Sequence, residues 1–67
     1  MEKYEYKLVS YSFNTRKLSS SDVLKIFNNE GANGWELVQW ETFKKRLNIL
    51  NTESVIYIDA TWKRKVN

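Results

Sequence analysis

Residues 31–38 read Gly-Ala-Asn-Gly-Trp-Glu-Leu-Val, and they predict a helix that turns directly into a strand. An amphipathic segment ends inside this stretch, and an alternating apolar segment begins before the stretch is over. We expect Gly34 to adopt the left-handed backbone conformation that ends the helix. We expect the ring of Trp35 to enter the core, with Leu37 on the same face of the strand.

The segment before this turn has the features of a helix that packs by one face. Ser19 is the expected N-cap of a capping box with Asp22, and Leu18 and Val23 occupy the two hydrophobic-staple positions. The side expected to be buried consists of Val23, Leu24, Phe27 and Gly31, with Ile26 at its margin.

Both glycines therefore have a predicted structural role. Gly31 lies on the expected buried side, where a missing side chain lets the helix approach the sheet or leaves room for Trp35. Valine at Gly31 is expected to overpack this contact, and valine at Gly34 is expected to strain the backbone. Both substitutions are predicted to be harmful.

Three segments alternate with period two, which is the pattern of strands: residues 3–13, 35–43 and 54–63. The first carries apolar groups on both faces, with Tyr4, Tyr6 and Leu8 on one face and Val9, Tyr11 and Phe13 on the other. In the second, simple alternation places Trp35, Leu37 and Gln39 on one face and Glu36, Val38 and Trp40 on the other.

The order strand, helix, strand, strand predicts an α+β fold for a single domain, residues 1–67. We expect a three-stranded antiparallel sheet, with the third strand in the middle and the helix packed on one face. The connection from Lys44 to Glu53 is polar and basic, yet it contains Leu47, Ile49 and Leu50. It could extend the flanking strands, fold back over the open face of a monomer, or form a contact surface.

The pattern resembles a family of small bacterial and phage domains of unknown function. The resemblance rests on a Tyr-rich opening strand over residues 4–9, the Gly-x-x-Gly-Trp-Glu-Leu-Val turn over residues 31–38, and the final Trp62-Lys63-Arg64. It covers nearly the whole chain, and it departs in the long connection from Lys44 to Glu53. The resemblance implies the fold, but it implies no activity and no catalytic residue.

Composition argues against catalysis. The 67 residues include no His and no Cys, so the usual general base and the best nucleophile are missing, together with any disulfide or common zinc site. We expect no enzyme activity, no metal and no cofactor. The charged N-terminus and the short apolar runs predict neither a signal peptide nor a membrane span, and thus a cytoplasmic protein of a bacterial or infected cell.

A small chain without disulfide or metal gains stability most readily by association. Since one helix cannot cover both apolar faces of the sheet, we expect a homodimer or a higher oligomer. Pockets between such subunits would suit a nucleotide-type or other anionic small ligand, sequestered in the manner of phage counter-defence proteins. The candidate ligand-binding residues are Tyr11, Arg16, Trp40, Lys44, Arg46, Tyr57 and Arg64.

Two other functions remain open. A sheet with exposed aromatics and basic edges suits single-stranded nucleic acid, although the net charge is only +3 and acidic residues lie on the strands. Alternatively, residues 44–53 form the contact of a protein-partner adaptor.

Overall fold

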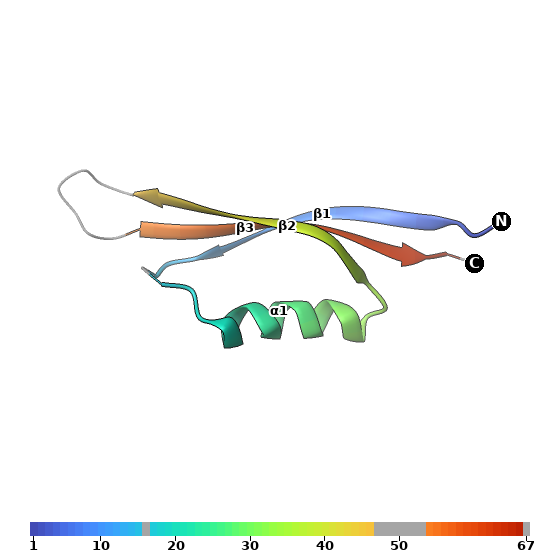
Figure 1. Ribbon diagram of the computed structural model, residues 1–67, viewed down its shortest axis with the longest axis horizontal. Coiled ribbons are helices and arrows are strands. Elements are labelled where there is room, and N and C mark those ends of the chain that lie inside the picture. The colour runs from blue at the N-terminus through green and yellow to red at the C-terminus, as the bar shows by residue number, and fades with distance from the viewer. Residues whose placement is uncertain (16, 47–53, 67) are drawn as a thin grey trace.

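The described part of the chain consists of three long strands and one helix. A computed structural model describes residues 1–15, 17–46 and 54–66. The elements along the chain are β1 (Tyr4–Phe13), α1 (Ser20–Ala32), β2 (Glu36–Arg46) and β3 (Ser54–Lys65). The molecule is long and flat, with extents of 54 × 20 × 12 Å (Figure 1). The predicted β-α-β-β order and α+β class are confirmed.

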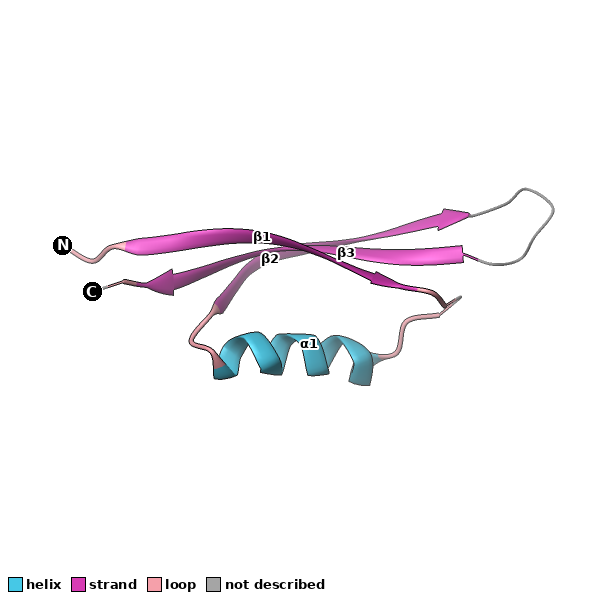
Figure 2. Ribbon diagram, turned by 180° about the vertical axis from the view of Figure 1, so that it is seen from behind, coloured by secondary structure: helices cyan, strands magenta, loops and turns pink. Residues whose placement is uncertain are grey.

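The three strands form one antiparallel sheet in the order β1-β3-β2. The third strand is therefore the central one, as expected. Tyr11 pairs with Ile58 across β1 and β3, and Thr42 pairs with Ile58 across β2 and β3. Both views of the ribbon show α1 lying along one face of the sheet, and no other helix occurs among residues 1–15, 17–46 and 54–66 (Figures 1 and 2).

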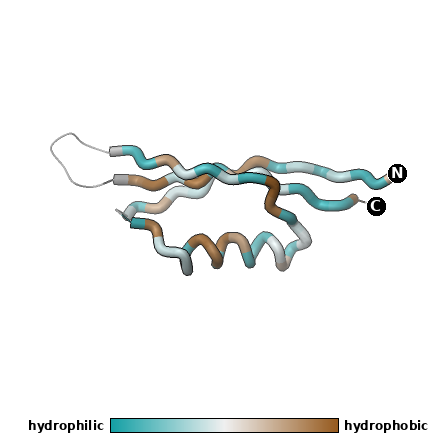
Figure 3. The backbone as a smooth tube through the Cα atoms, in the orientation of Figure 1, coloured by the Kyte–Doolittle hydropathy of each residue, from teal (hydrophilic) through white to brown (hydrophobic). Residues whose placement is uncertain are grey.

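The core lies between β3 and α1. Four side chains of β3 are buried among the described residues, namely Ile56, Ile58, Ala60 and Trp62. The helix contributes Phe27, whose ring meets those of Trp62 and Trp40 edge to face, at centroid distances of 5.8 and 5.4 Å. The hydropathy colouring accordingly places apolar stretches on α1 and on the facing strands (Figure 3). A single central strand supplies most of a very small core.

At the start of α1 the predicted N-cap is confirmed, but the contact of Asp22 differs from that of the predicted capping box. Ser19 is the N-cap, and its Oγ accepts a hydrogen bond from the backbone N–H of Asp22 at 3.3 Å. The carboxylate of Asp22 accepts from the Ser19 hydroxyl at 2.8 Å. In a standard capping box the acidic side chain would accept from the backbone N–H of the N-cap. The Asp22 charge also lies in the first turn, where the helix dipole favours an anion.

The end of α1 is a Schellman motif. The backbone N–H of Trp35 donates to the carbonyl of Glu30, and that of Gly34 donates to the carbonyl of Gly31, each at 3.0 Å. Gly34 has φ +86°, so the predicted left-handed residue is confirmed. This motif turns the chain from the helix into β2 over very few residues.

The expectation for Gly31 is wrong. Gly31 is exposed, and a Cβ built on it would meet no atom within 4 Å. The half-buried residues of the helix are Asp22, Val23, Ile26, Phe27 and Glu30, while Leu24 is 54% exposed. The half-buried stripe of the helix thus includes Ile26 and the charged Glu30. A search for apolar residues at helical spacing does not predict Glu30 on this stripe.

The simple alternation expected for the second strand is also wrong. Leu37 pairs with Trp62 and Gln39 pairs with Thr61, so Val38 is the extra residue of a β-bulge. Because of this bulge, Leu37 and Trp40 both face the helix, although they are separated by an odd number of positions. The contact between Trp40 and Phe27 depends on this irregularity.

Residues 44–46 continue β2, so this part of the predicted connection is strand. Residues 47–53, with Leu47, Ile49 and Leu50, lie outside the described part of the chain. The sequence alternatives for that stretch therefore stay predictions. No helix among the described residues is long and apolar enough to cross a membrane.

Candidate functional site

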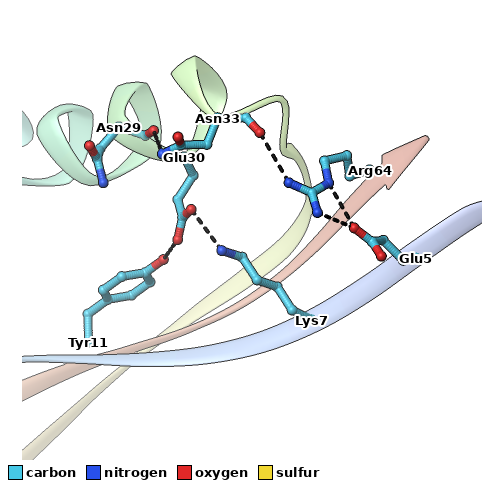
Figure 4. A network of polar contacts seen from close by, with 7 residues as sticks. All are labelled: Glu5, Lys7, Tyr11, Asn29, Glu30, Asn33 and Arg64. Atoms are coloured by element: carbon cyan, nitrogen blue, oxygen red, sulfur yellow. Dashed lines mark hydrogen bonds and ion pairs between the residues drawn. The ribbon is translucent and has the colours of Figure 1, made fainter. Parts of the chain in front are cut away.

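A polar network joins the last turn of α1 to β1. Glu30 accepts a hydrogen bond from the Lys7 ammonium at 2.8 Å and from the Tyr11 hydroxyl at 2.8 Å (Figure 4). Lys7 and Tyr11 project from the same face of β1, two strand positions on either side of Val9. One carboxylate thus links the helix to two points of the sheet.

Arg64 and Trp35 extend this network to the helix-to-strand turn. Two cations lie close to the Trp35 ring, with Lys7 Nζ 4.4 Å and Arg64 Cζ 4.3 Å from its centroid. Arg64 Nε donates to Glu5 Oε1 at 2.8 Å, and its guanidinium reaches the carbonyl of Asn33 at 3.5 Å (Figure 4). Trp35 is half-buried against charged groups, whereas the sequence predicted that it enters the apolar core.

The ionisation of this network follows from its contacts. The hydrogen bond from Lys7 is the main cause that holds the pKa of Glu30 below its ordinary value, and the Tyr11 hydroxyl acts in the same direction. Burial, followed by the hydrogen bond to Glu30, raises the pKa of Tyr11 to about 12. At neutral pH the Tyr11 hydroxyl therefore stays protonated and donates a hydrogen bond to the charged carboxylate of Glu30.

Two candidate ligand-binding residues are therefore engaged within the chain. The Tyr11 hydroxyl is held by Glu30, and the Arg64 charge is paired with Glu5. Each cation of the network lies beside a carboxylate, which leaves little net charge to attract a phosphate. The network fixes the helix on the sheet rather than forming an anion site.

The other side of the sheet is different. We call it the open face: the side chains of the three strands that point away from α1. By register it comprises Tyr4, Tyr6, Leu8, Ser10 and Ser12 of β1; Val55, Tyr57, Asp59, Thr61, Lys63 and Lys65 of β3; and Glu36, Gln39, Glu41, Phe43 and Lys45 of β2.

Large apolar side chains of the open face are exposed. The exposed fraction is 82% for Leu8, 64% for Tyr6, 47% for Phe43 and 40% for Tyr4. Tyr57, directly opposite Phe43 in the register, is half-buried. Such exposure on strands of a folded sheet marks this face as the main candidate binding surface.

The middle of the open face is a hollow of about 280 Å³. It is lined by Leu8, Val9, Ser10, Gln39, Glu41, Asp59, Ala60 and Thr61. Charge is distributed unevenly around it, with Lys63 and Lys65 toward one end of the sheet and Asp59 and Glu41 at the hollow. Ser10 Oγ donates to Asp59 Oδ1 at 2.6 Å, which holds one wall.

The structure does not gather the predicted ligand-binding residues at one place. Tyr11, Trp40, Lys44 and Arg64 belong to the helix-facing side of the sheet by register, whereas Tyr57 belongs to the open face. Lys44 of β2 pairs with Ile56 near the start of β3, whereas Arg64 lies near the end of β3. Arg16 and the Arg46 side chain lie outside the described residues.

Sequence reasoning missed Glu5, Lys7 and Glu30, which hold the network, and Leu8 and Phe43 of the open face. The pairing of Lys7 with Glu30 has no local sequence signal, because 23 positions separate them along the chain. Leu8 had a signal, since alternation already placed it with Tyr4 and Tyr6 on one face. In the described ranges, Asp and Glu side chains form no group that could hold a metal ion.

The described residues define a small α+β domain in which α1 covers one face of the sheet and leaves the other face open. The sequence matches the model of a family described as a domain of unknown function (DUF4177) over residues 4–65, and the chain belongs to that family. No curated protein and no solved structure matches the chain.

Proposed function

We propose that the protein is a non-catalytic binding protein that acts as a homo-oligomer, with its open face buried between copies. The observation that supports this most is the exposure of Tyr6 and Leu8, 64% and 82%, on a face that α1 does not cover. Contiguous apolar surface of this kind marks interaction sites in soluble proteins, and a closed homo-oligomer buries it.

The smallness of the core supports the same proposal. Among the described residues only Ile56, Ile58, Ala60 and Trp62 are buried, and the chain has no cysteine to form a disulfide. A domain of this size gains relatively little from its own core. Association stabilises the folded chain by mass action, so burial of the open face adds what the monomer lacks.

We also propose a ligand class for the oligomer: an anionic molecule with an aromatic ring, such as a nucleotide. Tyr57 and Phe43 are cross-strand neighbours on the open face, and Lys45 lies in the next row, opposite Val55. Aromatic side chains stack on bases, and cations pair with phosphate. The proposed role is sequestration of a nucleotide-type signal in the cytoplasm of a bacterial or phage-infected cell.

Titration calorimetry with a panel of cyclic and linear nucleotides tests the ligand. We expect measurable heat for at least one of them, and at least a tenfold loss of affinity in Tyr57→Ala. Tyr11→Phe is the matched control, because Tyr11 faces the helix, and it should keep the affinity. Absence of heat for every nucleotide contradicts the proposed ligand class. The homo-oligomer is then tested separately by measuring the mass of the protein in solution.

Single-stranded nucleic acid is the second candidate, and the exposed Tyr4, Tyr6 and Phe43 favour it. Asp59 and Glu41 at the centre of the same face oppose it, because they repel a phosphate backbone that crosses the sheet. Binding of oligonucleotides that weakens with salt would favour this candidate. No change in tryptophan fluorescence with oligonucleotide at low salt would remove it.

The adaptor function remains a sequence prediction, since most of residues 44–53 lie outside the described ranges. Deletion of residues 47–53 with a short turn in their place tests it. If the deletion leaves the circular dichroism and the oligomeric state unchanged but abolishes binding of a cellular partner, the result supports the adaptor function over binding through the open face.

A further inference from the structure

The hollow lies at the centre of the open face, counted along the strands. The residues of β3 on this face, from Val55 to Lys65 in steps of two, mark six cross-strand rows. The hollow lies between the third and fourth rows, lined from both by Thr61 and Asp59. An axis through the hollow therefore leaves equal numbers of rows on either side.

We propose that two copies of the chain pack open face to open face about a two-fold axis that crosses the strands at the hollow, with Leu8 of each copy entering the hollow of the other. This rests on the proposed function, and it specifies the partner and the contact. The strands of the second copy run in the opposite direction, an end-for-end arrangement, and each strand lies over the same strand of its partner. Each row therefore faces the partner's row that lies at the same distance on the other side of the axis, so that the first row faces the sixth.

Shape supports this arrangement. Leu8 stands on the rim of the hollow and is 82% exposed, which is a protrusion beside a depression on one surface. The two-fold axis places Leu8 over the partner's Ser10, a small residue on the opposite rim. A two-fold contact is self-complementary, so one protrusion and one depression on the same face satisfy both copies at once.

Charge supports the same register. Asp59 comes to lie over the partner's Thr61, and Glu41 over the partner's Gln39, so that these two carboxylates meet a hydroxyl or amide donor, whereas Glu36 comes to lie over the partner's Phe43. Lys63, whose Nζ lies 4.9 Å from the Tyr4 ring centroid and 4.0 Å from Glu36 Oε2 in its own chain, comes to lie opposite the row of the partner's Tyr57. No carboxylate faces a carboxylate, and no lysine faces a lysine.

The alternative face-to-face arrangement lacks this complementarity. If the two-fold axis ran along β3, Lys63 would face the partner's Lys63 and Asp59 would face the partner's Asp59. Like charges opposed across an interface are unfavourable and discriminate against that pairing. The charge pattern of the open face therefore selects the end-for-end orientation.

The area is sufficient for a small dimer. Rows about 6.6 Å apart on three strands about 4.8 Å apart give a flat area of roughly 500 Å² for each copy. Both copies together bury roughly 1,000 Å², which is near the lower limit for specific interfaces.

Subunit mass tests the contact at Leu8. Leu8→Asp adds a charge to the centre of the interface but lies on the surface of the single chain, so the fold should survive. Light scattering after size exclusion should show twice 8.0 kDa for the unsubstituted protein and 8.0 kDa for Leu8→Asp. Leu24→Asp is the matched control: Leu24 is 54% exposed on α1, away from the open face, and its variant should remain a dimer.

A distance between spin labels tests the orientation independently of that substitution. The chain has no native cysteine, so Lys65→Cys gives one label site per copy. Because Lys65 lies in the outermost row, the end-for-end dimer predicts a label separation of about 35 Å. The axis along β3 predicts a separation below about 20 Å.

The outcomes separate the two proposals. An unsubstituted protein of 8.0 kDa at every concentration tested overturns both the homo-oligomer and this interface. A dimer that survives Leu8→Asp, or labels at Lys65 closer than about 20 Å, overturns only the end-for-end contact.

Discussion

Gly34 and Gly31 lie three positions apart and have opposite requirements. Gly34 has φ +86°, a conformation that costs an L-residue about 1–2 kcal/mol, and its nearest neighbour at a built Cβ is Arg64 Cδ at an ordinary 3.5 Å. Backbone strain, rather than crowding, is thus the reason for glycine there. Gly31 sits in the helix with open space around it.

Gly34→Ala and Gly31→Ala form a matched pair. We expect Gly34→Ala to lower the free energy of unfolding by about 1 kcal/mol through strain. Gly31→Ala should raise it by about 0.5–1 kcal/mol, because alanine is the better helix former and meets nothing. Urea denaturation of both variants measures these changes. Equal losses in both variants would contradict the assignment of Gly31 to the exposed side.

Tyr11 makes stability depend on pH in the alkaline range. Its pKa is raised from 10.0 to about 12, mainly by burial, so the folded state holds this proton where the unfolded state releases it. The stabilisation is complete below pH 10 and is lost as the pH rises to about 12.

The difference in the free energy of unfolding between the protein and Tyr11→Phe measures this effect. It should be constant below pH 10 and should change between pH 10 and 12, where the unsubstituted protein loses stability relative to the variant. Parallel stability curves across that interval would show that Tyr11 is not the responsible group.

At the level of the elements, the sequence predicted those features that depend only on residues close together in the chain. The Ser19 cap, the left-handed Gly34 and the period-two strands each arise from a few neighbouring residues, and each is found. The face of Trp40 and the buried stripe of α1 were not predictable in this way. A bulge shifts the alternation of β2 by one residue, and the pairing of Glu30 with Lys7 and Tyr11 rotates the helix.

The candidate site shows the same division. Alternation predicted that β1 is apolar on both faces, and the exposed Tyr4, Tyr6 and Leu8 follow from it. Of the predicted cations whose side chains the structure describes, Lys44 and Arg64 lie near opposite ends of the sheet, and Arg64 is paired with Glu5, 59 positions away along the chain. Such long-range pairs have no signal in a single sequence.

The bulge in β2 predicts a small effect of deleting one residue. Val38 is the extra residue, so its deletion leaves the strand in register, and Leu37 and Trp40, then two positions apart, both stay on the helix-facing side. Because Val38 is also 49% exposed, we expect urea denaturation of the deletion variant to show a loss of no more than about 1 kcal/mol in the free energy of unfolding. Deletion of Glu41, in the regular part of β2, is the matched control: it moves Trp40 or the residues after it to the opposite face and should cost at least about 2 kcal/mol. Equal losses in the two deletions would contradict the assignment of the bulge to Val38.

For the molecule as a whole, folding and association are predicted to be coupled. If the open face is buried between copies, the thermal midpoint of unfolding should rise with protein concentration, since association favours the folded chain. Leu8→Asp should remove this dependence and unfold at one temperature throughout the series. If the thermal midpoint of the unsubstituted protein does not change with protein concentration, the predicted coupling of folding to association is wrong.

Native mass spectrometry of the purified protein tests the burial of the open face between two copies most directly, because it reads the subunit count together with any retained small molecule. We predict a species of twice 8.0 kDa, with Leu8→Asp at 8.0 kDa. An additional mass in fixed ratio to the dimer would identify the ligand. A single species of 8.0 kDa for the unsubstituted protein under gentle conditions would contradict the proposal that a second copy covers this face.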